Sequence, residues 1–96
     1  MCTMIAEKTA VTGCGKGTTG WMQVNQVTVS YDHPSEMTLE HALNIDFVDS
    51  SQKLGPRIAV ELTPQSAQRL VELITVALEK GAAADPVAFE QMVSAS

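Results

Sequence analysis

The sequence predicts an α+β domain: a four-stranded antiparallel meander sheet with one long helix packed on one face and a short C-terminal helix. Three observations lead to this fold class. Apolar and polar residues alternate in several short runs over residues 2–62, which is typical of half-buried strands. One stretch with helical periodicity follows the last of these runs. The connections between the runs are short, which favours antiparallel pairing of neighbouring strands.

The first strand, predicted over residues 2–11, is followed by a glycine-rich segment. Residues 13–20, GCGKGTTG, hold four of the chain's six glycines. Their last six letters match the GxGxxG pattern, but that pattern cradles a dinucleotide only where it opens a helix. A strand follows instead, predicted from Trp21 to Tyr31, because apolar and polar side chains alternate there. We therefore expect a hairpin loop rather than a phosphate site.

The third and fourth strands are predicted over residues 43–47 and 58–62, where the same alternation returns. A slip of one residue would turn every apolar side chain to the other face, so the apolar sets of paired strands must lie opposite one another. This rule gives three rows across the second, third and fourth strands: Tyr31, Leu43 and Leu62; Val29, Ile45 and Val60; Val27, Phe47 and Ile58.

The first strand is expected to pair with the second through a hairpin that closes on the glycine-rich segment. That hairpin sets three residues of the first strand against three of the second: Ala6, Met4 and Cys2 against Val27, Val29 and Tyr31. The apolar phase of the second strand changes between Val24 and Val27. Such a change indicates a β-bulge near Asn25 and Gln26, which would shift this register.

The long helix is predicted from Pro64 to Lys80. Thr63 can cap it, and proline is favoured at the first helical position because its missing N–H costs nothing there. The apolar side chains of this stretch fall on an arc of roughly 160° when residues are placed every 100°. This arc is wide enough to cover one face of a sheet. Lys80 and Gly81 form the expected stop.

A second cap-and-start pair, Asp85-Pro86, predicts the short C-terminal helix. We therefore divide the chain into an α+β domain of residues 1–81 and a linker with a short helix over residues 82–96. Two or three helical turns are marginal alone, so this tail either folds back on its own domain or docks on a second subunit. One helix also leaves the second face of the sheet to water or to another subunit. We expect a homo-oligomer, with a dimer as the simplest form.

The composition excludes several classes of partner. The net charge is −5 and the chain has only six Lys and Arg side chains, so it lacks the clustered cations that phosphate contacts need. We expect no nucleic acid and no membrane as a partner. No apolar run approaches the length of a membrane span, and no signal peptide is recognisable, so a cytoplasmic location is expected. The two cysteines lack a CxxC spacing and are expected to be thiols.

The register brings two histidines together at one end of the sheet. His33 falls opposite His41, on the face that the helix is expected to cover. Tyr31 and Cys2 belong to the same end, and Thr63 brings the helix start there, with its unpaired backbone N–H groups and partial positive charge. The glycine-rich segment falls at the opposite end.

Three readings of this end stay open. In the first, Asp32-His33-Pro34 shapes a turn and His41 fills the edge of the core. In the second, the end is a small-molecule site that needs no cofactor. In the third, the two imidazoles and a thiolate or carboxylate hold a zinc-type metal ion. The residues favour the first reading most, and our functional prediction uses the second, with no metal and no other cofactor.

The small-molecule reading assigns roles by chemistry. Imidazoles act as acid or base near neutral pH, a phenol hydroxyl donates a hydrogen bond, and a thiol near a helix N-terminus can act as a nucleophile. Carboxylates can orient an imidazole, and amides at a helix start can bind an anionic group. The candidate catalytic residues are His33, His41, Tyr31 and Cys2. The candidate substrate-binding residues are Asp32, Glu40, Thr63, Gln65 and Ser66.

Four segments of the chain resemble a family of small bacterial single-domain proteins of unknown function. They are Met1-Cys2-Thr3-Met4-Ile5-Ala6-Glu7-Lys8, Gly15-Lys16-Gly17 to Trp21, Tyr31-Asp32-His33-Pro34 and His41-Ala42-Leu43-Asn44-Ile45-Asp46-Phe47. The resemblance covers about residues 1–80. It implies a single-domain unit and adds no catalytic assignment.

These observations together favour a small-molecule-binding protein or a small cofactor-independent enzyme of bacterial metabolism, with its site at the end that carries His33 and His41. One alternative is a non-catalytic homo-oligomeric interaction module that uses the exposed sheet face and the tail helix. The other is a small metal-dependent enzyme of the zinc type. A pocket around both imidazoles favours the first class, and packed histidines beside a symmetric interface favour the second.

Overall fold

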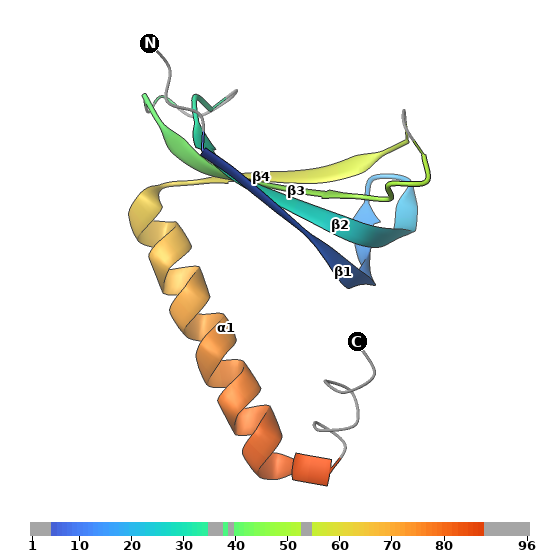
Figure 1. The fold of residues 1–96 in the computed structure, drawn as a ribbon, viewed down its shortest axis with the longest axis vertical. Coiled ribbons are helices and arrows are strands. Elements are labelled where there is room, and N and C mark those ends of the chain that lie inside the picture. The colour runs from blue at the N-terminus through green and yellow to red at the C-terminus, as the bar shows by residue number, and fades with distance from the viewer. Residues whose placement is uncertain (1–4, 35–37, 39, 53–54, 88–96) are drawn as a thin grey trace. The chain divides into compact units, whose positions relative to one another are not determined.

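The structure, a computed structural model, describes residues 5–34, 38, 40–52 and 55–87 of the 96. Four strands form one sheet in which sequence neighbours pair antiparallel: β1 (Ile5–Gly17), β2 (Gly20–Asp32), β3 (Ala42–Val48) and β4 (Arg57–Leu62). One long helix, α1 (Pro64–Ala84), follows in the described part of the chain (Figure 1). The predicted α+β class, with a four-stranded meander and a long helix after it, is confirmed.

The chain divides into two compact units, residues 1–64 and 65–96. The first unit contains the sheet, and the second contains α1 from Gln65 onward. The packing of the helix on one sheet face and the domain boundary after Gly81 stay predictions from the sequence.

The registers of β2 with β3 and of β3 with β4 are those that the sequence predicts. Val29 lies opposite Ile45, and Ile45 lies opposite Val60. The rows on either side of this one also agree with the prediction. Nine side chains therefore share one face, which we call the apolar sheet face: Val27, Val29, Tyr31, Leu43, Ile45, Phe47, Ile58, Val60 and Leu62.

The predicted register of β1 is wrong. Ala6 lies opposite Ser30 rather than Val27, and Ile5 rather than Cys2 pairs with Tyr31. The reason is the length of the hairpin. Most of the glycine-rich segment belongs to β1 rather than to a loop, so the strands pair as far as Gly17 and Gly20, and β1 slides along β2. Cys2 and Met4 lie outside the described residues.

The turn between β1 and β2 contains only Thr18 and Thr19. Gly20, directly after it, has a φ of +116°, a conformation that a residue with a Cβ rarely adopts. A glycine after a short turn is a common way to close a hairpin. The glycine requirement of this segment therefore comes partly from the turn and not from a phosphate group.

A β-bulge lies beside Asn25, near the predicted place, but its extra residue is in β1 rather than in β2. Ala10 pairs with Gln26 and Gly13 with Val24, so β1 carries one more residue than β2 over this interval. A bulge bends and twists its strand. In Figure 1 the second half of β1, in lighter blue, accordingly runs at a steep angle to the first half.

The bent end of the hairpin reaches the far side of the sheet. A Cβ at Gly15 of β1 would collide with Cδ1 of Ile58 in β4 and would lie 3.6 Å from Val24 Cγ1. In a flat sheet, β1 and β4 would lie about 14 Å apart, at about 4.8 Å per strand. The sheet therefore curls so that its two edge strands approach each other, and Gly15 leaves room for Ile58.

Few side chains are buried within the described residues. Val24 and Ala42 are the two buried hydrophobic residues there, so no member of the apolar sheet face is buried. Tyr31 and Val60 retain 38% and 37% of their accessible surface. Apart from the end at Ile58, which the bent hairpin approaches, the sheet by itself therefore leaves its apolar face without a cover.

The connection that follows β3 is held by Asp49. Its Oδ1 accepts hydrogen bonds from the backbone N–H of Ser51 at 3.0 Å and from the Ser51 hydroxyl at 2.7 Å. Asn25 of β2 joins this network, because its side-chain oxygen accepts a bond from the Ser50 N–H at 2.8 Å. The bonds from Ser51 are the main reason that the pKa of Asp49 lies below its usual value of 3.8.

Replacing Asp49 by Asn is expected to remove part of the pH dependence of stability. The pKa of Asp49 is lower in the folded protein than in the unfolded chain, where it is near 3.8. The carboxylate therefore stabilises the fold fully at pH values above 3.8, and this stabilisation is lost as the pH falls through the folded-state pKa. Urea unfolding at pH 6 and at pH 3 measures this. We expect the free-energy gap between wild type and Asp49→Asn to narrow at the lower pH. Glu72→Gln on α1 is the control, and a gap that stays constant with pH would show that the Asp49 charge does not stabilise this turn.

Helix α1 begins at Pro64, as predicted, but continues past Gly81 to Ala84. The predicted stop at Lys80 and Gly81 is wrong, because a glycine ends a helix by taking a positive φ and Gly81 does not. Three alanines, the strongest helix formers, follow it. The N–H of Asp85 still bonds to the Gly81 carbonyl at 3.0 Å. The helix ends just before Pro86, which disfavours helical geometry in the residue that precedes it.

The predicted short C-terminal helix falls mostly outside the described residues, which end at Val87. Of the described residues after α1, Pro86 and Val87 are helical at the predicted start of this helix, but they are too few to count as an element of their own. Among all the described residues, no helix combines the length and the apolar character that crossing a membrane requires.

Candidate functional site

The two histidines predicted to meet do so in the structure. His33 and His41 lie one step beyond the last paired residues of β2 and β3, Asp32 and Ala42. Their rings stack with centroids 4.9 Å apart and planes 23° apart. The Tyr31 ring also stacks with His41, at 5.4 Å and 5°. His41 therefore joins His33 and Tyr31 in a stack of three rings at the end of the apolar sheet face.

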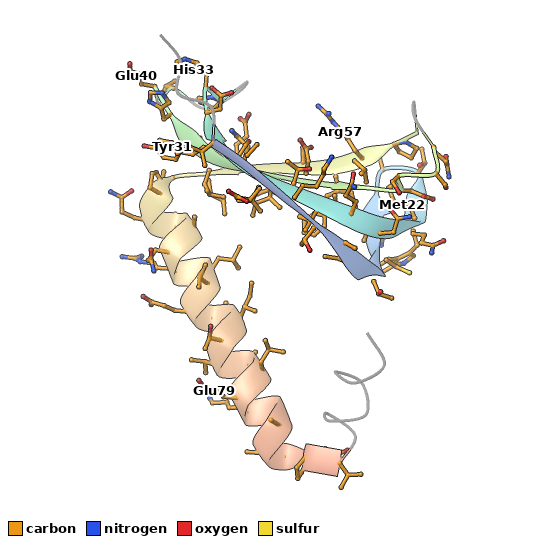
Figure 2. The ribbon with its side chains drawn as sticks, viewed as in Figure 1. Met22, Tyr31, His33, Glu40, Arg57 and Glu79 are labelled. Atoms are coloured by element: carbon orange, nitrogen blue, oxygen red, sulfur yellow. The ribbon has the colours of Figure 1, made fainter. Side chains whose placement is uncertain are left out.

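His33 is fixed by hydrogen bonds from its own loop. Its Nδ1 lies 2.7 Å from the carbonyl oxygen of Glu40, and its backbone N–H donates to Oδ1 of Asp32 at 2.7 Å. A carbonyl oxygen only accepts, so Nδ1 must carry a proton. In the neutral ring the second nitrogen, Nε2, is then the acceptor, which is the form that a general base needs. Figure 2 shows His33 and Glu40 together above Tyr31.

His41 has a different environment from His33. Its ring stacks with two neighbouring rings, those of Tyr31 and His33. Its position agrees with the reading in which His41 fills the end of the apolar face, whereas the exposed His33 is the better placed of the two for chemistry.

The stacked geometry of the two imidazoles does not suit two ligands of one metal ion. Stacked imidazoles turn their faces toward each other, whereas ligands of one ion must aim nitrogen lone pairs at a common point about 2 Å away. Within the described residues, no group of three or more His, Cys, Asp or Glu side chains could hold a metal ion. Cys2, the predicted third ligand, lies outside those residues. Cys14 is an exposed free thiol near the opposite end of β1.

The other predicted site residues divide between the two units. Asp32 and Glu40 lie beside His33, and Thr63 follows directly after β4 at the end of the sheet where Leu62 pairs with Leu43. Gln65 and Ser66 belong to the helical unit. The roles of Thr63, Gln65 and Ser66 in binding therefore stay predictions.

One contact at the site has no signal in the sequence. The sequence points to the carboxylate of Glu40 as a group that could orient an imidazole, but the atom on His33 is the Glu40 backbone carbonyl. Any residue at position 40 has that carbonyl. Only the path of the loop between β2 and β3 decides which carbonyl reaches the ring.

The opposite sheet face carries the polar residues that its register predicts. Arg57 and Asp46 form an ion pair there, with Nε and Oδ1 at 3.6 Å. The side-chain oxygens Asn44 Oδ1 and Asp46 Oδ1 are buried and have no hydrogen-bond partner. Figure 2 shows Arg57 well away from His33 and Tyr31. We find no link between these groups and the histidine end.

The fold and the ring stack define a class of protein. It is a small α+β chain in which a four-stranded meander is followed by one helix, and one end of the sheet carries a tyrosine and two histidines. The chain belongs to a protein family described as a family of unknown function, DUF6295, whose model matches residues 1–88. The resemblance that the sequence segments indicate is thereby confirmed. No curated protein and no solved structure matches the chain.

Proposed function

We propose that this chain is a small-molecule-binding protein or a small cofactor-independent enzyme, with its site at the end of the sheet that carries His33 and His41. The observation that carries the proposal is the 2.7 Å contact between His33 Nδ1 and the Glu40 carbonyl. A backbone carbonyl that fixes one nitrogen of an imidazole sets the tautomer and the direction of the other nitrogen. Enzymes and binding proteins use this arrangement to orient a histidine that accepts a proton or a hydrogen bond from a ligand.

The proposal gives the neighbouring groups distinct roles. His33 is the acid or base, Asp32 and Glu40 hold its loop, and His41 and Tyr31 support its ring from one side. A partly exposed Tyr31 hydroxyl can also donate to a ligand. We further propose that α1 packs over the apolar sheet face, with Thr63, Gln65 and Ser66 at the histidine end. There the free N–H groups of the helix start would bind an anionic part of the ligand.

The tautomer of His33 gives a direct test of the geometry. Nitrogen-15 NMR at neutral pH distinguishes a protonated Nδ1 from a protonated Nε2 through the shifts of the two nitrogens and their couplings to the ring carbons' protons. We expect the Nδ1–H form at His33. An Nε2–H form would mean that the bond to Glu40 does not exist in solution, and the proposed base would then be absent.

Binding itself is tested by native mass spectrometry of protein purified without chelator. We expect wild type to retain a small molecule, and His33→Phe to lose it, because phenylalanine keeps a flat ring but has no nitrogen. Trp21→Phe is the matched control, since Trp21 is an exposed ring near the hairpin turn and outside the proposed site. No retained mass in wild type, or equal retention in both variants, would contradict the His33 site and favour the non-catalytic class.

A further inference from the structure

The bent end of the β1–β2 hairpin has an inner and an outer side. The Cβ position of Gly15 faces Ile58, a member of the apolar sheet face, so this side of the hairpin is the inner one. Successive side chains of a strand point to opposite faces. Cys14 and Lys16 therefore point outward, and their cross-strand partners point the same way. We call the four outer residues the hairpin surface: Cys14, Lys16, Trp21 and Gln23.

The hairpin surface is open to solvent. All four of its side chains are exposed. Trp21 keeps 72% of its accessible surface, the largest fraction among the large hydrophobic side chains of the described residues. The apolar sheet face continues onto the inner side of the hairpin, whereas Trp21 lies on the outer side. An element that packs on the apolar sheet face therefore leaves Trp21 exposed.

The backbone under this surface is well held. Strand pairing continues as far as the two-residue turn, and Lys16 is the direct cross-strand neighbour of Trp21. On the inner side, Val24 is buried and the hairpin lies against Ile58. Direct neighbours in antiparallel strands have Cβ atoms about 4.5–5.5 Å apart. An ammonium group and an indole are therefore carried at neighbouring positions, on a backbone that loses little freedom when a partner binds.

The exposure of Trp21 points to a macromolecular partner. Small molecules bind in clefts that bury roughly 70–90% of the ligand, and a side chain that is 72% exposed does not line such a cleft. Tryptophan is among the residues that contribute most to the affinity of protein–protein interfaces. A nucleic acid needs clustered cations, which the hairpin surface lacks. A single exposed apolar side chain is ordinary, so the choice of a protein partner needs a second observation.

The second observation is that the hairpin is basic in an acidic chain. Residues 8–31 contain two lysines and no Asp or Glu, although the whole chain has 11 acidic residues and a net charge of −5. Asp49 contacts the hairpin at Asn25, and its carboxylate is bound there by Ser51. A partner with carboxylates is therefore attracted to the hairpin and repelled by the chain as a whole, which directs it to this surface.

We propose that the hairpin surface is a docking site for an acidic segment of another protein. An apolar side chain of that segment packs on the Trp21 indole, and a carboxylate pairs with the Lys16 ammonium. A second copy of this chain is a poorer occupant, because a two-fold contact between identical hairpin surfaces brings like-charged lysines together. The surface lies at the opposite end of β2 from Tyr31 and takes a different kind of ligand from the His33 site. The two sites are therefore tested separately.

The docking site is tested by selecting a random peptide library, displayed on phage, against the full chain. We expect the enriched peptides to combine Asp or Glu with a large apolar residue. Trp21 is the one tryptophan of the chain, so its fluorescence reports on this surface alone. A selected peptide that covers the indole should shift the emission to shorter wavelength.

Variants then assign the binding of the selected peptides to the two side chains. Trp21→Thr should weaken binding at least about 30-fold, the loss typical of an interface hot spot. Lys16→Gln should weaken it about 3- to 10-fold and reduce its dependence on salt. Lys80→Gln is the control, because it removes one positive charge from α1 and should leave binding unchanged.

Any of three results would overturn the proposal. The first is that no peptide is enriched, or that the enriched peptides lack acidic residues. The second is that they bind Trp21→Thr as well as wild type and leave the emission of Trp21 unshifted. The third is that raising the concentration of the chain alone shifts the emission, which would assign the hairpin surface to a second copy.

Discussion

Replacing Val29 by Asn is expected to lower the free energy of unfolding by about 3 kcal/mol or more, whereas Ser30→Asn is expected to change it by less than about 1 kcal/mol. The two residues are neighbours in β2, both are half-buried within the chain, and they point to opposite faces of the sheet. Val29 lies between Glu7 and Ile45, and Ser30 lies between Ala6 and Asn44. The introduced side chain is the same, so the face is the main difference.

The size of the Val29 effect comes from what covers the apolar sheet face. A covered valine loses its burial when it is replaced, and the new amide is left without partners, which together give the larger cost. A face open to water would make Val29→Asn cost only about 1 kcal/mol. Urea unfolding of the two variants and wild type decides between these values. Nearly equal costs at the two positions would contradict a covered apolar face.

The second large effect is expected at Gly15. Gly15→Val should destabilise the fold by about 1–3 kcal/mol, because its side chain must share space with Ile58 and Val24. Gly13→Val is the matched control, since a Cβ at Gly13 meets only Val24, at 3.9 Å. In a domain of this size, each kcal/mol of lost stability lowers the melting temperature by roughly 4–8 °C. Thermal unfolding therefore detects the loss expected for Gly15→Val.

A double-mutant cycle shows whether Ile58 causes the loss. The atom that a Cβ at Gly15 would strike is Cδ1 of Ile58, and Ile58→Val removes that atom. Ile58→Val alone should cost about 0.5–1.5 kcal/mol. We expect Gly15→Ala to cost less in the Ile58→Val background than in wild type, since close neighbours couple. Additive costs would mean that the bent hairpin does not reach β4.

The sequence predicts the central part of the sheet because side chains there carry the information. In β2, β3 and β4, apolar side chains such as Val29, Ile45 and Val60 alternate cleanly, and only one register puts them on one face. The end of β1 has no such signal. Gly13, Gly15 and Gly17 lack side chains, so their alternation cannot be read, and a strand looks like a loop.

The histidine end was predictable in position but not in detail. Once β2 and β3 are in register, His33 must lie near His41, and the ring stack confirms it. The bond from His33 to the Glu40 carbonyl depends on the path of a loop, which residue types do not specify. The extension of α1 beyond Gly81 has a similar cause, because a glycine can either end a helix or continue it, and the φ it adopts decides.

The central claim about stability is that the apolar sheet face is covered in the folded protein. The most direct test is the exposure of its methyl groups to a soluble paramagnetic agent. We predict that the methyl NMR signals of Val29, Ile45 and Val60 stay sharp in the presence of the agent. Broadening of all three signals would contradict a covered face.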